Sequence, residues 1–300
     1  TFGWFNSIYP VDIDNDGDLD IIAGNNGDNS YFRANSGNPL SMYWTDVDYN
    51  GTLDLWLTYI YQGKEFTYYQ LDEMAQSYPA FIKRKFTTYE KISSATATEI
   101  FGKDNMEQNK VFANDFTSLL LTNNNGIFRA TPLPRIAQLG PVFGIDCEDV
   151  DGNGYMDIML TGNSESPRVS HGRDDALNSV ILYNNGGQLK GKNGIRSGFW
   201  VPGDGKSLAM LPIKNEYPVW IANQNHGKTL AFKSEMSGQF IAAQGNEHAA
   251  IVELTNGQSR IQSMSNGAGY LSQRANGVWK TDKIKSITFI GSKGAKRIVK

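Results

Sequence analysis

Three short acidic segments contain the residues of this sequence that are best suited to chemistry. They read DIDNDGDLD at 12–20, DVDYNGTLD at 46–54 and DVDGNGYMD at 149–157. Each has an oxygen-bearing side chain at positions 1, 3 and 5, a glycine at position 6 and an aspartate at position 9. Alternate side chains of a tight loop can converge on one centre, so the pattern predicts three loops that each wrap a cation.

Calcium fits this pattern best, because it binds about six to eight oxygens, often with a glycine at the sharp turn and a main-chain carbonyl at position 7. We expect up to three Ca2+ ions. The predicted ligands of the first loop are Asp12, Asp14, Asp16 and Asp20, with Asp18 at position 7. Those of the second are Asp46, Asp48, Asn50 and Asp54, with Thr52 at position 7. Those of the third are Asp149, Asp151, Asn153 and Asp157, with Tyr155 at position 7.

Other interpretations of the loops fit less well. Magnesium keeps several waters and prefers a few carboxylates to a cage built entirely by protein. EF-hands place their closing acid later in the loop and have helical flanks, whereas the flanks here are typical of strands. An acidic turn held by Asx hydrogen bonds is the plain alternative for any one copy, and the repetition argues against it. The first loop has four carboxylates and is expected to bind calcium most tightly.

The charge of the chain is unevenly distributed. The net charge is −3, but residues 1–189 carry 12 basic and 25 acidic side chains, a balance of −13. Residues 190–300 carry 16 and 6, a balance of +10. An acidic part of that size would repel itself unless its carboxylates had a counter-charge. Calcium would supply one, since ten of the acids are predicted ligands.

Several classes of protein are excluded. No apolar run approaches the ~18 residues of a spanning helix, and residues 1–20 do not have the pattern of a signal peptide, so no transmembrane segment is expected. The single cysteine, Cys147, excludes an internal disulfide and is expected to be an inert core thiol. The cluster Lys83-Arg84-Lys85 is typical of a solvated face, so no nucleic-acid partner is expected.

The loops must be positioned by strands, and the neighbouring sequence indicates them. The apolar runs LDIIAGN, LDLWLTY and MDIMLTGN follow the three loops, and SLLLTNNNGIFRATPL and SVILYNNGGQL have the pattern of a strand with a turn. Together with the loops, these segments resemble the blades of FG-GAP or VCBS-repeat β-propellers, which also occur in integrin α-subunits. The resemblance implies four-stranded blades tied by calcium at the rim.

The predicted fold is mainly β: a partial β-propeller with calcium-binding blade loops, a helical insertion and a small β-rich C-terminal domain. Residues 1–70 are expected to form blades with two loops, and residues 111–234 blades with the third. Residues 71–110 are predicted to be helical, with a Thr96-x-x-Glu99 capping box and an end at Gly102. Residues 235–300 contain SRIQSMSNGAGYLSQ, which resembles the signature of the ASPIC/UnbV domain that commonly follows such propellers.

The resemblance implies a non-catalytic binding or scaffolding module at a bacterial cell surface. Proteins of this class are typically exported, and some are surface lipoproteins associated with outer-membrane nutrient uptake. The expected partner is therefore a protein or glycan at the cell surface, with an outer-membrane transporter complex as one form of it. Millimolar external calcium would suit loops of modest affinity.

A secreted propeller enzyme acting on polysaccharide, lipid or peptide is the alternative, because propellers can carry active sites. Its candidate acids outside the loops are Asp174 with Asp175, or Asp204. His171 and Arg173 adjoin the first pair. For this polar segment we favour an ion-paired loop over a catalytic site.

Overall fold

The computed structural model describes residues 2–77, 79–107, 109–165, 171–213 and 217–300. Strands predominate, and all pairings between them are antiparallel within these ranges, which confirms a mainly β protein. The chain forms two compact units. The smaller unit contains residues up to 4 together with 32–116, and the larger unit contains residues 5–31 and 117–300.

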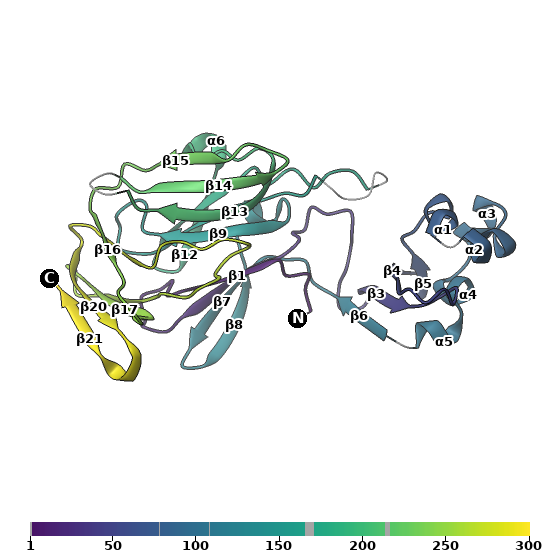
Figure 1. Cartoon of the computed structure of the whole chain (residues 1–300), viewed down its shortest axis with the longest axis horizontal. Helices are drawn as coiled ribbons and strands as arrows, with labels where there is room; N and C mark the ends of the chain where they lie inside the picture. The colour runs from purple at the N-terminus through teal and green to yellow at the C-terminus, as the bar shows by residue number, and fades with distance from the viewer. Residues whose placement is uncertain (1, 78, 108, 166–170, 214–216) are drawn as a thin grey trace. The chain divides into compact units, whose positions relative to one another are not determined.

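The smaller unit combines one sheet with a set of short helices (Figure 1). Its sheet has the order β5-β4-β3-β6 and is built from β3 (Leu40–Thr45), β4 (Asp54–Tyr61), β5 (Lys64–Thr67) and β6 (Asn109–Ala113). The helices follow β5 and are α1 (Leu71–Ser77), α2 (Pro79–Lys85), α3 (Tyr89–Ser93), α4 (Ala97–Phe101) and α5 (Lys103–Met106). Among the described residues, no helix has the length and apolar character needed to cross a bilayer.

The helices and the sheet share one core, centred on Trp56. The Trp56 ring is fully buried and stacks between Tyr43, at 5.8 Å between centroids, and Phe101 of α4, at 4.4 Å. Met74 and Ile100 of the helices are buried in the same cluster. The helical segment is therefore held by the strands on either side of the second acidic loop.

The predicted capping box is present at the start of α4. The Thr96 hydroxyl accepts a hydrogen bond from the Glu99 N–H at 3.2 Å, and the Glu99 carboxylate accepts one from the Thr96 N–H at 2.7 Å. The helix ends at Gly102, whose φ of 87° is readily adopted only by glycine. The sequence thus predicted this helix and both of its ends.

The larger unit begins with three sheets. The first has the order β1-β2-β7-β8, with β1 (Ser7–Val11), β2 (Asp20–Gly24), β7 (Leu119–Asn124) and β8 (Ile127–Pro132). The second has the order β12-β11-β10-β9, with β9 (Val142–Glu148), β10 (Asp157–Gly162), β11 (Val180–Asn185) and β12 (Gln188–Asn193). The third has the order β13-β14-β15, with β13 (Asp204–Leu211), β14 (Val219–Asn225) and β15 (Leu230–Lys233), which lie side by side in Figure 1.

The second sheet lies between the other two, which explains why every residue of β10 is buried. Side chains alternate across a strand. Ile158 and Leu160 accordingly belong to a core shared with the first sheet, while Met159 belongs to a core shared with the third. A one-residue shift of this strand would exchange the two sets of side chains, so its register is strongly fixed.

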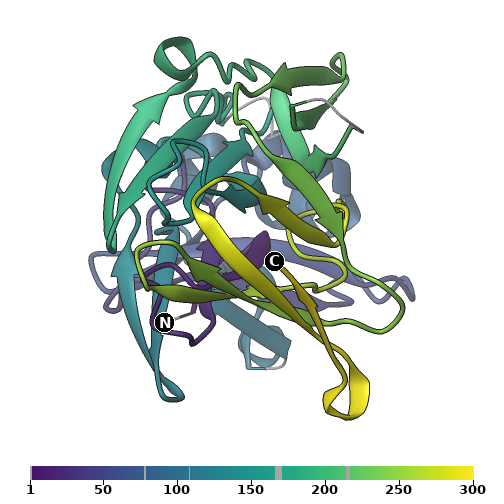
Figure 2. The ribbon, with the colours of Figure 1, turned by 90° about the vertical axis from the view of Figure 1, so that its left-hand side faces the viewer.

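The C-terminal part of the larger unit is also β-rich, and its strands face the viewer in Figure 2, in yellow-green and yellow. Strands β16 (Gln239–Ala242) and β19 (Gly277–Lys280) form a pair. A second sheet has the order β18-β17-β20-β21, from β17 (Ala249–Leu254), β18 (Ser259–Ser263), β20 (Ile284–Ile290) and β21 (Lys296–Val299). Its core contains Val252, Ile287 and Phe289, all fully buried. Short helical turns lie at η1 (Arg135–Gln138), α6 (Gly194–Ser197) and η2 (Ser292–Gly294).

Replacing Trp56 with alanine should destabilise the smaller unit by about 3–5 kcal/mol, because it removes a fully buried aromatic ring and leaves a cavity. Urea denaturation, with hydrogen exchange of residues 40–61 to assign the transition, measures this. Leu55→Ala is the matched control, since Leu55 neighbours Trp56 but is 54% exposed, and should cost less than about 0.5 kcal/mol. Equal losses in the two variants would contradict the described core.

Candidate metal centres

Each acidic loop joins two neighbouring antiparallel strands: β1 to β2, β3 to β4, and β9 to β10. The position-9 aspartate is the first residue of the second strand in each hairpin. All three hairpins have the same register, in which this aspartate pairs with the residue before position 1: Asp20 with Val11, Asp54 with Thr45, and Asp157 with Glu148. The register therefore brings the two ends of each acidic segment together.

The loops also share their internal hydrogen bonds. The position-6 glycine N–H donates to the position-1 carboxylate at 3.1, 2.8 and 2.9 Å in the first, second and third loops. The position-2 N–H donates to the position-9 carboxylate at 2.8, 3.0 and 2.9 Å in the same order. The three segments thus fold to one local structure in spite of different residues at positions 2, 4, 7 and 8.

This structure depends on the position-6 glycines. Gly17, Gly51 and Gly154 have φ values of 92°, 87° and 99°, a region that side chains with a Cβ rarely adopt. Position 4 also has positive φ in all three loops, where it is occupied by Asn15, Tyr49 and Gly152. These turns place successive N–H groups inside the loop, where they orient the carboxylates.

The aspartates at positions 1, 3 and 9 form three compact triads. In each triad one carboxylate oxygen per residue lies within 4.8 Å of the others: Asp12, Asp14 and Asp20; Asp46, Asp48 and Asp54; Asp149, Asp151 and Asp157. Several of these oxygens are buried and accept no hydrogen bond from any described residue, namely Oδ1 of Asp12, Asp14, Asp48 and Asp149. A buried oxygen without a partner costs free energy. A bound cation would remove that cost, so the residues present fit one.

The position-5 side chains are turned toward the backbone of their own loops. Their Oδ1 atoms accept the position-7 N–H at 2.8 Å in all three loops, with Asp16, Asn50 and Asn153 as the acceptors. This bond closes the second half of each loop. It uses only one oxygen of Asp16, whereas the amides of Asn50 and Asn153 each have a single oxygen.

The position-7 side chains have separate roles. The Asp18 carboxylate accepts the Asn125 N–H at 2.7 Å, in the turn between β7 and β8. The Thr52 hydroxyl donates to the Asn50 side chain, and the Tyr155 hydroxyl accepts a bond from Gln258 at 2.8 Å. Any contribution of position 7 to a cation would therefore come from its main-chain oxygen.

The three loops differ in how deeply their aspartates are buried. Asp12, Asp20 and Asp157 are fully buried and Asp149 is nearly so, whereas the second-loop triad is half-buried. Burial raises the pKa of Asp12 to about 6 and that of Asp157 to about 7. Burial also raises the pKa of Asp54. Proton and cation therefore compete for the same carboxylates, most strongly in the first and third loops.

Two asparagines complete the buried loops and were not predicted from the sequence. The Asn123 N–H donates to Asp20 at 2.7 Å and the Asn184 N–H donates to Asp157 at 2.8 Å. Their side-chain amides donate to the position-8 carbonyls of Leu19 and Met156, both at 3.2 Å. The repeated asparagines in TNNNG and YNNGG were the available signal. In the smaller unit the corresponding strand is β5, and residues 64–71, which include β5 and the segment after it, contain no asparagine, which is a further difference of the second loop.

The other candidate acids are engaged in different ways. Asp204 is buried, forms an ion pair with Lys206 at 2.5 Å and accepts a bond from Asn225 at 3.2 Å, so it is not free for proton transfer. Asp174 pairs through its backbone with Ser164, and burial followed by the charge of Asp175 raises its carboxyl pKa. The His171 ring stacks on Tyr31 at 4.1 Å. Cys147 is fully buried, as the sequence predicted.

No family model matches the chain, and no curated protein matches its sequence. The chemistry of the site therefore follows from its geometry. Three carboxylates converge in each loop without a thiolate or imidazole among the described groups, which is the donor set of a hard cation.

The metal-free protein should lose stability as pH rises from about 5 to 8. A carboxyl whose pKa is raised on folding stabilises the fold while it is protonated, and this contribution disappears as the pH passes the folded-state value, about 7 for Asp157. Melting of demetallated protein at the two pH values measures the loss. Asp157→Asn should reduce it, whereas exposed Asp282→Asn should not. An identical pH profile for wild type and Asp157→Asn would contradict the assignment.

Proposed function

We propose that this chain is part of a calcium-stabilised β-propeller of the FG-GAP or VCBS type that serves as a non-catalytic binding or scaffolding module. The observation that carries the proposal is one loop structure, repeated in three hairpins, with buried carboxylate oxygens that accept no hydrogen bond from the described residues. The presence of the same nine-residue structure in three separate hairpins is hard to explain by turn formation alone, because a turn needs no buried acids.

Calcium is favoured over magnesium by the number and kind of donors. Positions 1, 3 and 9 supply three carboxylates within one loop, and a main-chain oxygen at position 7 is a usual further ligand in calcium loops. Calcium accepts such irregular cages of many oxygens, whereas magnesium requires near-octahedral geometry and retains water. The propeller assignment is supported by the four-stranded antiparallel sheets and by the arrangement of their first strands, since β1 and β13 both lie beside β9.

The proposed setting is the outside of a bacterial cell, with a surface protein or glycan as the partner. External calcium is abundant enough to fill loops of modest affinity. A module in this position needs mechanical and thermal stability more than mobility at its rim, and cations that tie neighbouring strands provide it. Association with an outer-membrane transporter complex is one form that this role can take.

Chelation should lower the melting temperature of the chain, and calcium should restore it better than magnesium. The physical reason is mass action: a cation that binds only the folded state stabilises it by about 2.7 kcal/mol when its concentration is 100 times the dissociation constant. Thermal melting in chelator, calcium and magnesium, together with calorimetric titration of up to three sites, measures this. Identical melting curves in all three buffers would contradict the calcium proposal.

Asn184→Ala should weaken calcium binding at the third loop by about 10- to 100-fold, the usual effect of removing a group that orients a metal ligand. The side-chain amide of Asn184 donates a hydrogen bond to the Met156 carbonyl and so holds the loop. The neighbouring Asn185 is exposed, so Asn185→Ala is the matched control. Calorimetric titration of the two variants compares them. The proposal for Asn184 fails if both bind calcium as the wild type does.

A further inference from the structure

Strand β18 of the C-terminal sheet lies against two of the three acidic loops. The Ile261 N–H donates to Oδ2 of Asp12, in the first loop, at 2.9 Å. The guanidinium of the adjacent Arg260 donates to the carbonyl of Gly154, in the third loop, at 2.8 Å. Both bonds are long-range, because β18 is more than 100 residues away from either loop along the chain. Strand β18 is therefore hydrogen-bonded to two candidate metal centres at once.

The first and third loops also contact each other directly. The side-chain amide of Asn15 donates to the Gly154 carbonyl at 3.2 Å, so this oxygen accepts bonds from both Asn15 and Arg260. The Asn184 amide donates to the Ile13 carbonyl at 2.6 Å as well as to Met156. A movement of either loop must therefore disturb the other.

The charge of Arg260 is buried between these loops. Its side chain is 2% exposed, and its Nε atom has no hydrogen-bond partner among the described residues. The acids that face it are Glu148, Asp149 and Asp12. Two of them, Asp149 and Asp12, are the position-1 members of the third and first triads. A buried guanidinium is costly unless nearby acids balance it, and here the balancing acids are the candidate cation ligands.

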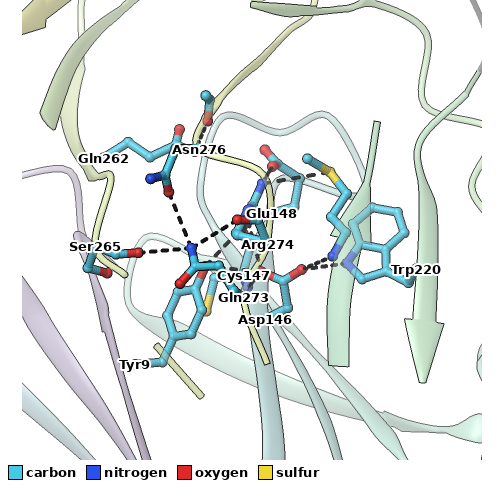
Figure 3. A network of polar contacts seen from close by, with 12 residues as sticks. Tyr9, Asp146, Cys147, Glu148, Trp220, Gln262, Ser265, Gln273, Arg274 and Asn276 are labelled. Atoms are coloured by element: carbon cyan, nitrogen blue, oxygen red, sulfur yellow. Dashed lines mark hydrogen bonds and ion pairs between the residues drawn. The ribbon is translucent and has the colours of Figure 1, made fainter. Parts of the chain in front are cut away.

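A second arginine holds the C-terminal part to the strand that leads into the third loop (Figure 3). Arg274 donates to Asp146 at 2.8 Å, to Glu148 at 2.7 Å and to the Cys147 carbonyl at 2.8 Å. Asp146 in turn accepts a bond from the Trp220 indole at 2.9 Å. Glu148 thus pairs with Arg274 and faces Arg260, and it immediately precedes the first ligand of the third loop.

We propose that the first and third loops and strand β18 form one coupled metal centre, in which Arg260 is a positioning residue that supplies the counter-charge when the cations are absent. This inference rests on the proposed function of the loops in calcium binding. The charges are compatible with both states, since the two loops present eight carboxylates against one arginine and two divalent cations. Calcium takes over the role of counter-charge and fixes the loops against which β18 packs.

Coupling of this kind is reciprocal. If calcium strengthens the docking of β18, then a docked β18 raises the affinity for calcium by the same factor. The second loop belongs to the smaller unit and offers the same side-chain ligands as the third, so it provides the comparison within the chain.

Hydrogen exchange of the full chain, with and without calcium, tests the coupling. Calcium should slow exchange of residues 259–263 by about 5- to 150-fold, the usual range of such coupling. Asp54→Asn, in the second loop, should leave this protection in place, whereas Asp20→Asn, in the first, should remove most of it. Calorimetric titration of the same samples reports whether calcium binds.

The two measurements distinguish the failure of each proposal. Calcium binding without added protection of 259–263 would overturn the coupled centre and leave the calcium loops intact. Absence of calcium binding would overturn both. Protection that is equal in Asp20→Asn and Asp54→Asn would also overturn the coupling, because the effect would then not depend on the loop that Ile261 contacts.

A second test concerns Arg260 itself. Arg260→Met should increase the difference in melting temperature between calcium and chelator, because the metal-free loops then lack their counter-charge, and Arg260→Lys should keep the wild-type difference. Arg297→Met is the matched control, since Arg297 pairs with Glu247 in the same sheet, at 2.7 Å. A merely structural role would lower both melting temperatures equally, and an unchanged difference in Arg260→Met would overturn the role of Arg260. The exchange experiment needs no Arg260 variant.

Discussion

Repulsion between carboxylates that are held close together and away from water is the constraint on which the rest of this structure depends. In bulk water, two charges about 4 Å apart interact by about 1 kcal/mol, but partial burial raises this several-fold. The hairpins bring three aspartates to such distances, and in two loops the position-1 and position-9 members are buried. Hydrogen bonds from the loop backbone relieve one oxygen of each. Asn123 and Asn184 donate to the second oxygens of Asp20 and Asp157. Oδ1 of Asp12 and of Asp149 accepts no hydrogen bond from the described residues, and a bound cation would satisfy it.

The local part of this arrangement could be predicted because it is encoded within nine residues. The bonds from position 6 to 1, from 2 to 9 and from 7 to 5 all lie inside the loop, and Gly17 and its equivalents are needed for them. The distant part could not be predicted in the same way. Asn123 approaches Asp20 from 103 residues away, and Ile261 approaches Asp12 from 249. The repeated asparagines are a signal for Asn123 and Asn184, but nothing in the sequence indicates that the Ile261 N–H will complete Asp12.

The fold shows the same division. The capping box at Thr96 and the glycine at 102 are local signals, and they identified a helix and its ends. The packing of those helices against Trp56 and Tyr43 is a long-range outcome, decided by which apolar faces remain uncovered once β3 and β4 have paired. Composition indicated a change of structure near residue 71, but the compact unit that contains the helices already begins at Phe32. The four-part division of the chain stays a prediction.

Comparison of the second and third loops shows what the ligand pattern leaves undecided. Both have Asp, Asp, Asn and Asp at positions 1, 3, 5 and 9, so the sequence predicts equal sites. Burial alone does not decide which of the two loops has the higher affinity for a cation, because a less polar site strengthens attraction to the cation and also favours protonation of Asp157. The preorganisation of the loops does distinguish them. The third loop has Asn184 to orient Asp157 and Arg260 to hold Gly154, so on the proposed function little of its binding free energy would be spent on ordering the loop. The second loop shares the internal hydrogen bonds of the third, but its tip at Tyr49 is exposed, so on the proposed function it would spend more binding free energy on ordering.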